Sequence, residues 1–249
     1  MKVHQISAFG HQFTRLGLFN CYLVRESDSF TLIDTTMSGG ARRIVDAAHR
    51  IAMEPIARLL LTHAHGDHIG SLDALAAALG STQASELAGD PAGQAQVAIG
   101  AREARLLPKK PAQDRSLDPD EPRCPVKGGF PGADTRPTHL LSDGELYGSL
   151  RVVATPGHTP GHMSYFDERD GTLYAGDALV TVGGEVHVSG FGPWYFPLPA
   201  MATWHRPTAL ASARKLLELP IRRYAAGHGR IVEGGPELLQ DAVRRAEGR

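Results

Sequence analysis

The sequence has few cysteines, no long apolar run and no excess of charge of either sign. Cys21 and Cys124 are its only cysteines, too few for a disulfide framework. Lysine and arginine number 26 against 27 aspartates and glutamates, so no strong field favours nucleic acid or an anionic membrane as partner. No run approaches the roughly 20 apolar residues of a membrane span, and the first residues lack the apolar stretch of a signal peptide. These absences predict a soluble, cytoplasmic protein that binds neither nucleic acid nor membrane.

The chain, with 249 residues, is long enough for one large domain with its own core, and we predict a single domain over residues 1–249. Short β-branched and aromatic runs predict strands at residues 3–8, 19–24, 30–33, 56–61, 139–141, 150–154, 163–166, 172–175 and 223–226. Apolar residues at helical spacing predict helices at residues 39–51, 70–79, 206–217 and 237–247, and an Ala- and Gln-rich stretch suggests another at 89–105. This mixture favours an α/β fold of two sheets with helices outside.

Two stretches carry no periodicity. Residues 108–137 are rich in proline, glycine and charge, and residues 183–199 are rich in glycine, proline and aromatics. Segments of this composition and length are typical of long loops or lids. We interpret both as lid-like insertions within one domain.

A cluster of polar residues follows the predicted strand at 56–61. The segment LLLTHAHGDH ends in His63, His65, Asp67 and His68. Three imidazoles and a carboxylate are costly to bury without partners, and a divalent cation would offset that cost because both are its natural ligands. His63 and His65 project to one side, while Asp67 and His68 can face a second point, so the spacing suits two metals. The alternative is a solvated histidine-rich turn.

Three later segments repeat this arrangement. His158, Asp177 and His228 each follow a predicted strand and lie beside glycine. Glycine lets the backbone turn tightly and approach a site closely. We therefore expect the strand ends to converge on one site at the edge of a sheet core.

Taken in order, the motifs THAHGDH, GHTPGH, GDA and GHG, with LIDT upstream at residues 32–35, resemble the metallo-β-lactamase superfamily. The resemblance spans nearly the whole chain. It implies a four-layer αβ/βα sandwich with two divalent metal ions in a cleft at one edge of the two sheets. Zinc is the usual metal it implies, with iron and manganese as alternatives that nitrogen and oxygen ligands do not distinguish.

The resemblance also implies a role for each motif residue. The expected ligands of one metal are His63, His65 and His158. Those of the other are Asp67, His68 and His228. Asp177 is expected to bridge both metals, and Asp34 to accept a hydrogen bond that orients a ligating histidine. His162, which follows the second motif, is expected to support the ligands.

The implied mechanism is hydrolysis by a hydroxide that the two metals generate from a shared water. One metal polarises the substrate oxygen. We hypothesise that Asp67 holds the hydroxide and passes on its proton. The expected reaction is cleavage of an ester, lactone or thioester bond.

Departures from known branches narrow this expectation. β-Lactamases of the superfamily usually have Cys or His where Asp177 stands. Glyoxalase II carries a helical glutathione-binding domain, whereas 21 residues follow His228. Many acyl-homoserine lactonases have Tyr at the position of Val180. A glyoxalase II-like or lactonase-like branch without that extra domain is expected.

Other functions stay open. An iron-dependent persulfide dioxygenase-like oxidoreductase is the first alternative, since that group shares the motif. β-Lactamase or phosphodiesterase activity is a further alternative, as is a non-catalytic binding protein on the same scaffold.

The aromatic loop at residues 191–197 is the candidate for substrate specificity. Phe191, Trp194 and Tyr195 could form an apolar wall near the metals, which predicts a small-molecule substrate with an apolar or acyl portion. The alternative is a packed loop or a homodimer contact.

Overall fold

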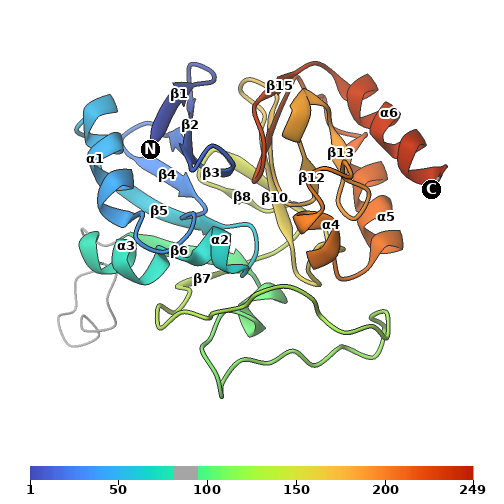
Figure 1. Cartoon of the computed structure of the whole chain (residues 1–249). Helices are drawn as coiled ribbons and strands as arrows, with labels where there is room; N and C mark the ends of the chain where they lie inside the picture. The colour runs from blue at the N-terminus through green and yellow to red at the C-terminus, as the bar shows by residue number, and fades with distance from the viewer. Residues whose placement is uncertain (81–94, 249) are drawn as a thin grey trace.

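The computed structural model describes residues 1–80 and 95–248. Two β-sheets face each other, and helices cover their outer faces (Figure 1). The first sheet has the strand order β1-β2-β3-β4-β5-β6-β7. Its strands are β1 (Lys2–Gln5), β2 (Gly10–Arg15), β3 (Phe19–Arg25), β4 (Phe30–Ile33), β5 (Ile56–Leu61), β6 (Gln96–Gly100) and β7 (His139–Leu141).

The second sheet has the strand order β15-β14-β11-β10-β9-β8, and β12 and β13 form a separate pair. The strands of the sheet are β8 (Leu146–Tyr147), β9 (Leu150–Ala154), β10 (Met163–Asp167), β11 (Thr172–Gly176), β14 (Arg223–Ala226) and β15 (Val232–Glu233). The pair consists of β12 (Leu179–Val180) and β13 (His187–Val188).

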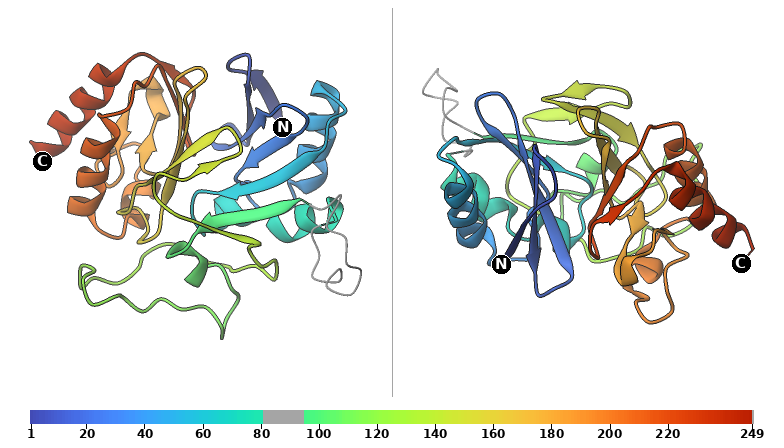
Figure 2. Two further views of the ribbon diagram at one scale, coloured as in Figure 1. Left: turned by 180° about the vertical axis from the view of Figure 1, so that it is seen from behind. Right: turned by 90° about the horizontal axis from the view of Figure 1, so that it is seen from above.

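The helices divide between the two sheets. Those of the first half are α1 (Ala41–Ile51), α2 (Gly66–Ile69), α3 (Leu72–Ala78) and the 3-10 turn η2 (Glu103–Arg105). Those of the second half are η3 (Val182–Gly184), α4 (Leu198–Ala202), α5 (Arg206–Leu216) and α6 (Pro236–Glu247). Seen from above, α1 and α6 lie at opposite sides of the molecule with both sheets between them (Figure 2). None of the helices in the described ranges has the length and apolarity needed to cross a membrane.

Three apolar clusters separate four layers. In β5, Leu59 and Leu61 pack towards α1 and α3, whereas Leu60 packs between the sheets. In β11, Leu173 packs towards α5 and α6, whereas Tyr174 packs between the sheets. This alternation follows from the two-residue period of a strand. Both faces of each sheet are therefore buried, and the predicted αβ/βα sandwich is confirmed.

Strand direction decides where the polar motifs meet. Strands β4, β5 and β6 are parallel in the first sheet. In the second sheet β11 is parallel to β14, and β9 and β11 both run antiparallel to β10. Ligands of sheet proteins gather at the carboxyl ends of parallel strands. The segments after β4, β5, β9, β11 and β14 thus emerge at the edge where the two sheets meet.

The predicted helix at 89–105 is wrong over residues 96–100, and only Glu103–Arg105 is helical, as the 3-10 turn η2. Residues 89–94 lie outside the described residues, but Gln96–Gly100 forms β6, paired with β5 and β7. Four of its five residues are buried. A strand buried on both faces lacks alternation and resembles a short helix in composition. Strand β2 and the short strands β8, β12, β13 and β15 were not predicted from the sequence.

Candidate metal centre

Seven polar side chains gather where the strand ends meet. His63 and His65 follow β5, and the short helix α2 carries Asp67 and His68. The other three residues follow β9, β11 and β14, and are His158, Asp177 and His228. In the described parts of the chain, ligand atoms of these residues form three groups, each within 4.8 Å. The groups are His63, His65 and His158; His63, His68 and Asp177; and Asp67, His68 and His228.

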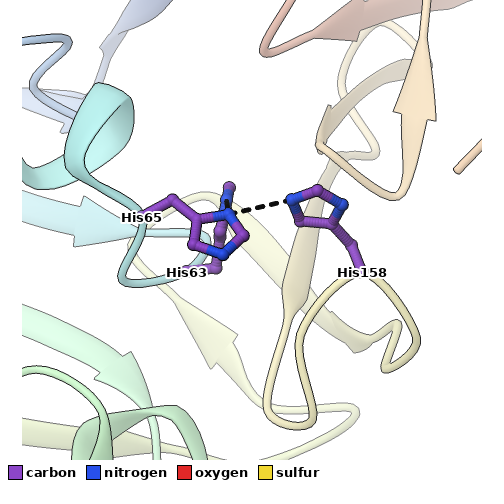
Figure 3. Close-up of side chains that lie close together, drawn as sticks. All are labelled: His63, His65 and His158. Carbon is purple, nitrogen blue, oxygen red and sulfur yellow. Dashed lines mark hydrogen bonds between the residues drawn. The ribbon is translucent and has the colours of Figure 1, made fainter. Parts of the chain in front are cut away.

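In the first group three imidazole rings converge on one point (Figure 3). His65 Nδ1 lies 3.1 Å from His63 Nε2 and 3.0 Å from His158 Nε2. His63 and His65 come from the first sheet, while His158 comes from the loop after β9 in the second. The site therefore spans the two halves of the sandwich.

The outer ring nitrogens of His65 and His158 show where their protons lie. His65 Nε2 donates to the Lys127 carbonyl at 3.0 Å. The Thr203 hydroxyl donates its one proton to the Pro199 carbonyl, so it must accept from the Ser189 hydroxyl. Because the Ser189 proton is used in this way, His158 Nδ1 donates to the Ser189 oxygen at 3.0 Å. A neutral imidazole carries one proton. The inner nitrogens of both rings therefore present lone pairs, as a metal ligand must.

Asp34 orients the imidazole rings of His68, directly, and of His63, through Thr62. Its Oδ2 accepts from Thr62 Oγ1 and from His68 Nδ1, each at 2.8 Å. Because the Thr62 hydroxyl donates to Asp34, it accepts from His63 Nδ1 at 3.0 Å. The Nε2 atom of His63 is then free to bind a cation. Burial opposes the charging of His68, but the carboxylates of Asp177, Asp34 and Asp67 raise its pKa well above the ordinary value, so a cation at His68 Nε2 would displace a proton. Asp34 adopts a left-handed backbone, φ 60°, a strained conformation of the kind found at functional sites.

Asp177 lies between the two sets of histidines. Its Oδ1 is 3.3 Å from His68 Nε2, and its Oδ2 is 3.4 Å from His158 Nε2 and 3.2 Å from His228 Nε2. Asp67 Oδ2 approaches His228 Nε2 at 3.3 Å. Asp177 thus lies within 3.4 Å of ring nitrogens from both sets of histidines, and Asp67 lies beside the second group.

The protonation of these groups fits a cation in their midst. Burial keeps the pKa of His63 and His158 well below the ordinary value, so both rings are neutral. Burial also opposes the charging of His228, yet the nearby Asp177 carboxylate raises its pKa to about 9. The negative charge of Asp177 therefore stabilises positive charge on the neighbouring ring of His228. His68 Nε2 and Asp177 Oδ1 are buried and lie 3.3 Å apart without forming a hydrogen bond of good geometry, and a divalent cation would satisfy both.

Close backbone approach makes glycine necessary at position 227. A Cβ atom there would lie 2.3 Å from Asp177 Oδ1 and 2.5 Å from the ring of His68. Asn20 and Tyr22 donate to the Ala226 carbonyl at 3.0 and 2.6 Å and so hold the loop that carries His228. A larger residue at position 227 would push this loop away from the centre.

Comparison with known proteins settles the family of this fold and site. The family model of the metallo-β-lactamase superfamily matches residues 15–228. The chain belongs to the metallo-β-lactamase superfamily. Members of this superfamily are metal-dependent hydrolases, and the His and Asp groups of this chain are compatible with metal binding.

Relatives within the superfamily cover most of the chain. The protein YobT of Bacillus subtilis (strain 168), described as uncharacterized, is 42% identical over 236 residues, which are 94% of this chain and 93% of YobT. The hydroxyacylglutathione hydrolase of Methylococcus capsulatus is 29% identical over 168 residues, 65% of this chain and 48% of that enzyme. The structure of the B3 metallo-β-lactamase BLEG-1 matches with a TM-score of 0.64 and 24% identity, covering 93% of this chain and 96% of that one. The structural likeness shows the shared superfamily fold.

A cavity opens on the metal centre of this superfamily member. Five of its lining residues belong to the centre, namely His65, Asp67, His158, Asp177 and His228. The others are apolar side chains or glycines, namely Phe19, Gly66, Gly129, Phe196, Leu198, Pro199 and Ala202. The rings of Phe19 and Phe196 lie 5.4 and 5.6 Å from that of His228. An apolar wall therefore adjoins the second metal group.

The three residues predicted to form this wall do not line the described cavity. Trp194 is 89% exposed and Tyr195 54% exposed, and Phe191 packs against the cluster under α5 and α6. The Phe196 amide donates to the Pro193 carbonyl at 3.0 Å, closing a turn. Residues at the tip of this turn point to solvent, whereas Phe196 after it points inward. Of this loop, Phe196 lines the described cavity and the three predicted side chains do not.

The irregular segment at 108–137 also contacts residues of the candidate metal centre. Besides the Lys127 carbonyl, the Gly129 carbonyl accepts from the Gly66 amide at 3.0 Å, and the Phe130 ring lies 4.5 Å from that of His65. His162 contacts a residue of the candidate centre. Its Nε2 accepts from the Asp177 amide at 3.0 Å, while burial lowers its pKa to about 3. The sequence analysis did not identify Glu103, a fully buried carboxylate that accepts hydrogen bonds from Ala64 and Thr159.

Proposed function

We propose that this protein hydrolyses an uncharged ester, lactone or thioester with an apolar acyl portion, using two divalent metal ions, zinc in the first instance. The observation that carries the proposal is the lining of the cavity. Among the described residues that line it, every polar side chain belongs to the metal centre, and the remaining surface is apolar. Pockets of this kind bind apolar ligands and orient them by few polar groups.

The residues that would hold the metals are His63, His65, His158 and Asp177 for one ion, and Asp67, His68, His228 and Asp177 for the other. When bound, such ions supply Lewis-acid activation of water and of a substrate carbonyl. Asp67 lies beside this chemistry, since its carboxylate lines the cavity and its side chain is 31% exposed. Asp67 would accept a proton from the attacking water and return it to the leaving group.

The apolar part of the substrate would lie against Phe19, Phe196 and Leu198. A glutathione thioester carries carboxylates, and the described cavity lining offers no lysine or arginine to bind them. The same argument disfavours a phosphodiester or a β-lactam carboxylate as natural substrate. A neutral acyl ester or lactone therefore fits this cavity better than the substrate named for the hydroxyacylglutathione hydrolase relative.

The test combines metal analysis with a panel of aryl esters, lactones, thioesters, phosphodiesters and β-lactams. We expect about two zinc ions per chain and the highest kcat/KM on uncharged esters or lactones with a medium or long acyl chain. Preference for an anionic substrate would overturn the proposal. So would iron as the only active metal, with oxygen consumed in the presence of a persulfide.

Replacing Leu198 by Asp should lower kcat/KM for long-chain esters by about tenfold, because burial of a leucine-sized apolar contact contributes roughly 1.5–3 kcal/mol. Short-chain esters should be hydrolysed as by the wild type. Leu198 is the first residue of α4, where an acidic side chain is compatible with the helix dipole, so folding should be retained.

Trp194→Ala is the matched control for Leu198→Asp. Trp194 belongs to the same loop region but is exposed and outside the cavity lining, so its removal should leave the chain-length profile unchanged. Equal losses on short and long esters in the Leu198 variant would contradict the proposed wall. A homodimer and a cytoplasmic location stay predictions.

A further inference from the structure

Glu103 is a fully buried carboxylate outside the cavity lining. It begins η2, three residues after β6 ends. Its Oε1 accepts from the Ala64 amide at 2.9 Å, and its Oε2 accepts from Thr159 Oγ1 at 2.8 Å and from the Gly161 amide at 3.0 Å. One side chain thus receives three hydrogen bonds from two distant segments.

Both segments carry expected metal ligands. Ala64 lies between His63 and His65 in the loop after β5, and Thr159 follows His158 in the loop after β9. The two loops belong to different sheets. The carboxylate of Glu103 therefore joins the two halves of the three-histidine group, and it is not among the residues that line the described cavity.

The backbones around Glu103 leave little room for adjustment. A Cβ atom on Gly161 would lie 2.2 Å from the Glu103 amide nitrogen, and one on Gly100 would lie 2.8 Å from the Gly161 carbonyl oxygen. Glycine at both positions lets the loop after β9 rest directly on the chain between β6 and η2. The loop position is consequently defined by contact as well as by hydrogen bonds.

Keeping a carboxylate at this place costs free energy. Burial raises the pKa of Glu103 to about 7, although its three hydrogen bonds and the nearby Arg102 act in the opposite direction. An apolar side chain would avoid this cost, but it would leave the amides of Ala64 and Gly161 without an acceptor. The buried carboxylate of Glu103 is therefore unfavourable by itself, but it satisfies and holds the amides of Ala64 and Gly161.

We infer that Glu103 is a positioning residue that fixes the spacing of His63 and His65 against His158 and so sets the affinity of the first metal. The contacts of the three rings depend on this spacing, because the inner nitrogens lie only 3.0–3.1 Å apart. The inference rests on the expected metal ligands and on no particular substrate.

The test is Zn²⁺ binding to the Glu103→Gln variant, measured by competition with a chelator in the absence of substrate. The glutamine amide keeps the volume but places an N–H donor either against the Ala64 amide or against the donors of both Thr159 and Gly161. We expect one of the two zinc equivalents to bind about 10–100-fold more weakly, the range for residues that support ligands, while the other is unchanged. The visible absorption of the Co²⁺-substituted variant should change as well, because the geometry of the histidine group changes.

Asp167→Asn is the matched control. Asp167 is as buried as Glu103 and lies at the far end of β10, where Arg169 donates to it at 2.7 and 2.8 Å. The Asp167→Asn substitution should lower the free energy of unfolding without weakening zinc binding. Equal loss of zinc affinity in both variants would reduce Glu103 to a general structural role and overturn the inference.

Thr159→Val removes one of the three donors with little change of shape, and keeps the inference testable if Glu103→Gln does not fold. It should weaken the same zinc equivalent severalfold. Normal binding of both zinc ions by the folded Glu103 variant, or by the Thr159 variant if the former does not fold, would contradict the inference. A chain that binds zinc as expected but hydrolyses no ester would overturn the proposed function and leave this inference standing.

Discussion

Replacing Asp177 by Asn is expected to weaken metal binding by about 10²-fold or more and to abolish hydrolysis. Asp177 carries a buried negative charge within 3.4 Å of ring nitrogens from both metal groups. Removing one partner from a buried charged pair costs roughly 3–5 kcal/mol, and each 1.4 kcal/mol is about a factor of ten in affinity. Asparagine has nearly the same shape, so the loss reports the charge and not the packing.

Metal content after dialysis and zinc affinity by chelator competition measure this effect. Asp170→Asn is the control, because Asp170 precedes β11 as Asp177 follows it. Asp170 accepts from the Thr172 amide at 3.0 Å, away from the metal centre. The control should bind zinc as the wild type does. An Asp177 variant that retains two tightly bound metals would contradict the bridging role.

Replacing Asp67 by Asn should lower kcat by about 10²–10⁴-fold, the usual contribution of a positioned acid–base group. Burial alone would raise the pKa of Asp67, but the charge of His68 and the hydrogen bond from His228 outweigh it and lower the pKa. The carboxylate is therefore ionised, which a proton acceptor requires, while the same interactions make it a weaker base. Asparagine can still donate an oxygen ligand but cannot exchange that proton.

The measurement is kcat at saturating ester together with the metal content of the same sample. Full activity with normal metal content would refute the acid–base role, whereas loss of one metal would show that Asp67 acts mainly as a ligand. Asp73→Asn serves as control, since Asp73 lies on the next helix and accepts from Thr135 outside the cavity. Its kcat should stay unchanged.

Much of this architecture was predictable from local patterns. The strands at Phe30–Ile33, Ile56–Leu61 and Leu150–Ala154 match their predicted ranges, because each is a compact apolar run bounded by polar or turn residues. Strand β6 was mistaken for a helix, since a strand buried on both faces shows no alternation. Short strands such as β12 hold two residues, too few for any period to be visible.

Some features of the candidate metal centre were also predictable from the sequence, and others were not. The types and order of the proposed ligands, from His63 to His228, were visible because imidazole and carboxylate are the usual protein ligands of divalent cations. Asp34 was also predictable, from the motif that contains it. Its link through Thr62 to His63 was not, because a hydrogen-bond chain depends on side-chain directions that no spacing encodes.

The sequence by itself determined the superfamily and the residues proposed as metal ligands, since both depend on residue type at fixed local positions. The tertiary structure alone decided which side chains form the cavity wall and what holds the two halves of the centre together. Phe196 faces the cavity and Trp194 faces solvent because one turn lies between them. Glu103 contacts Ala64 and Thr159 across 39 and 56 residues of chain. Such contacts arise from the packing of two sheets, which brings together segments whose sequences carry no mark of each other.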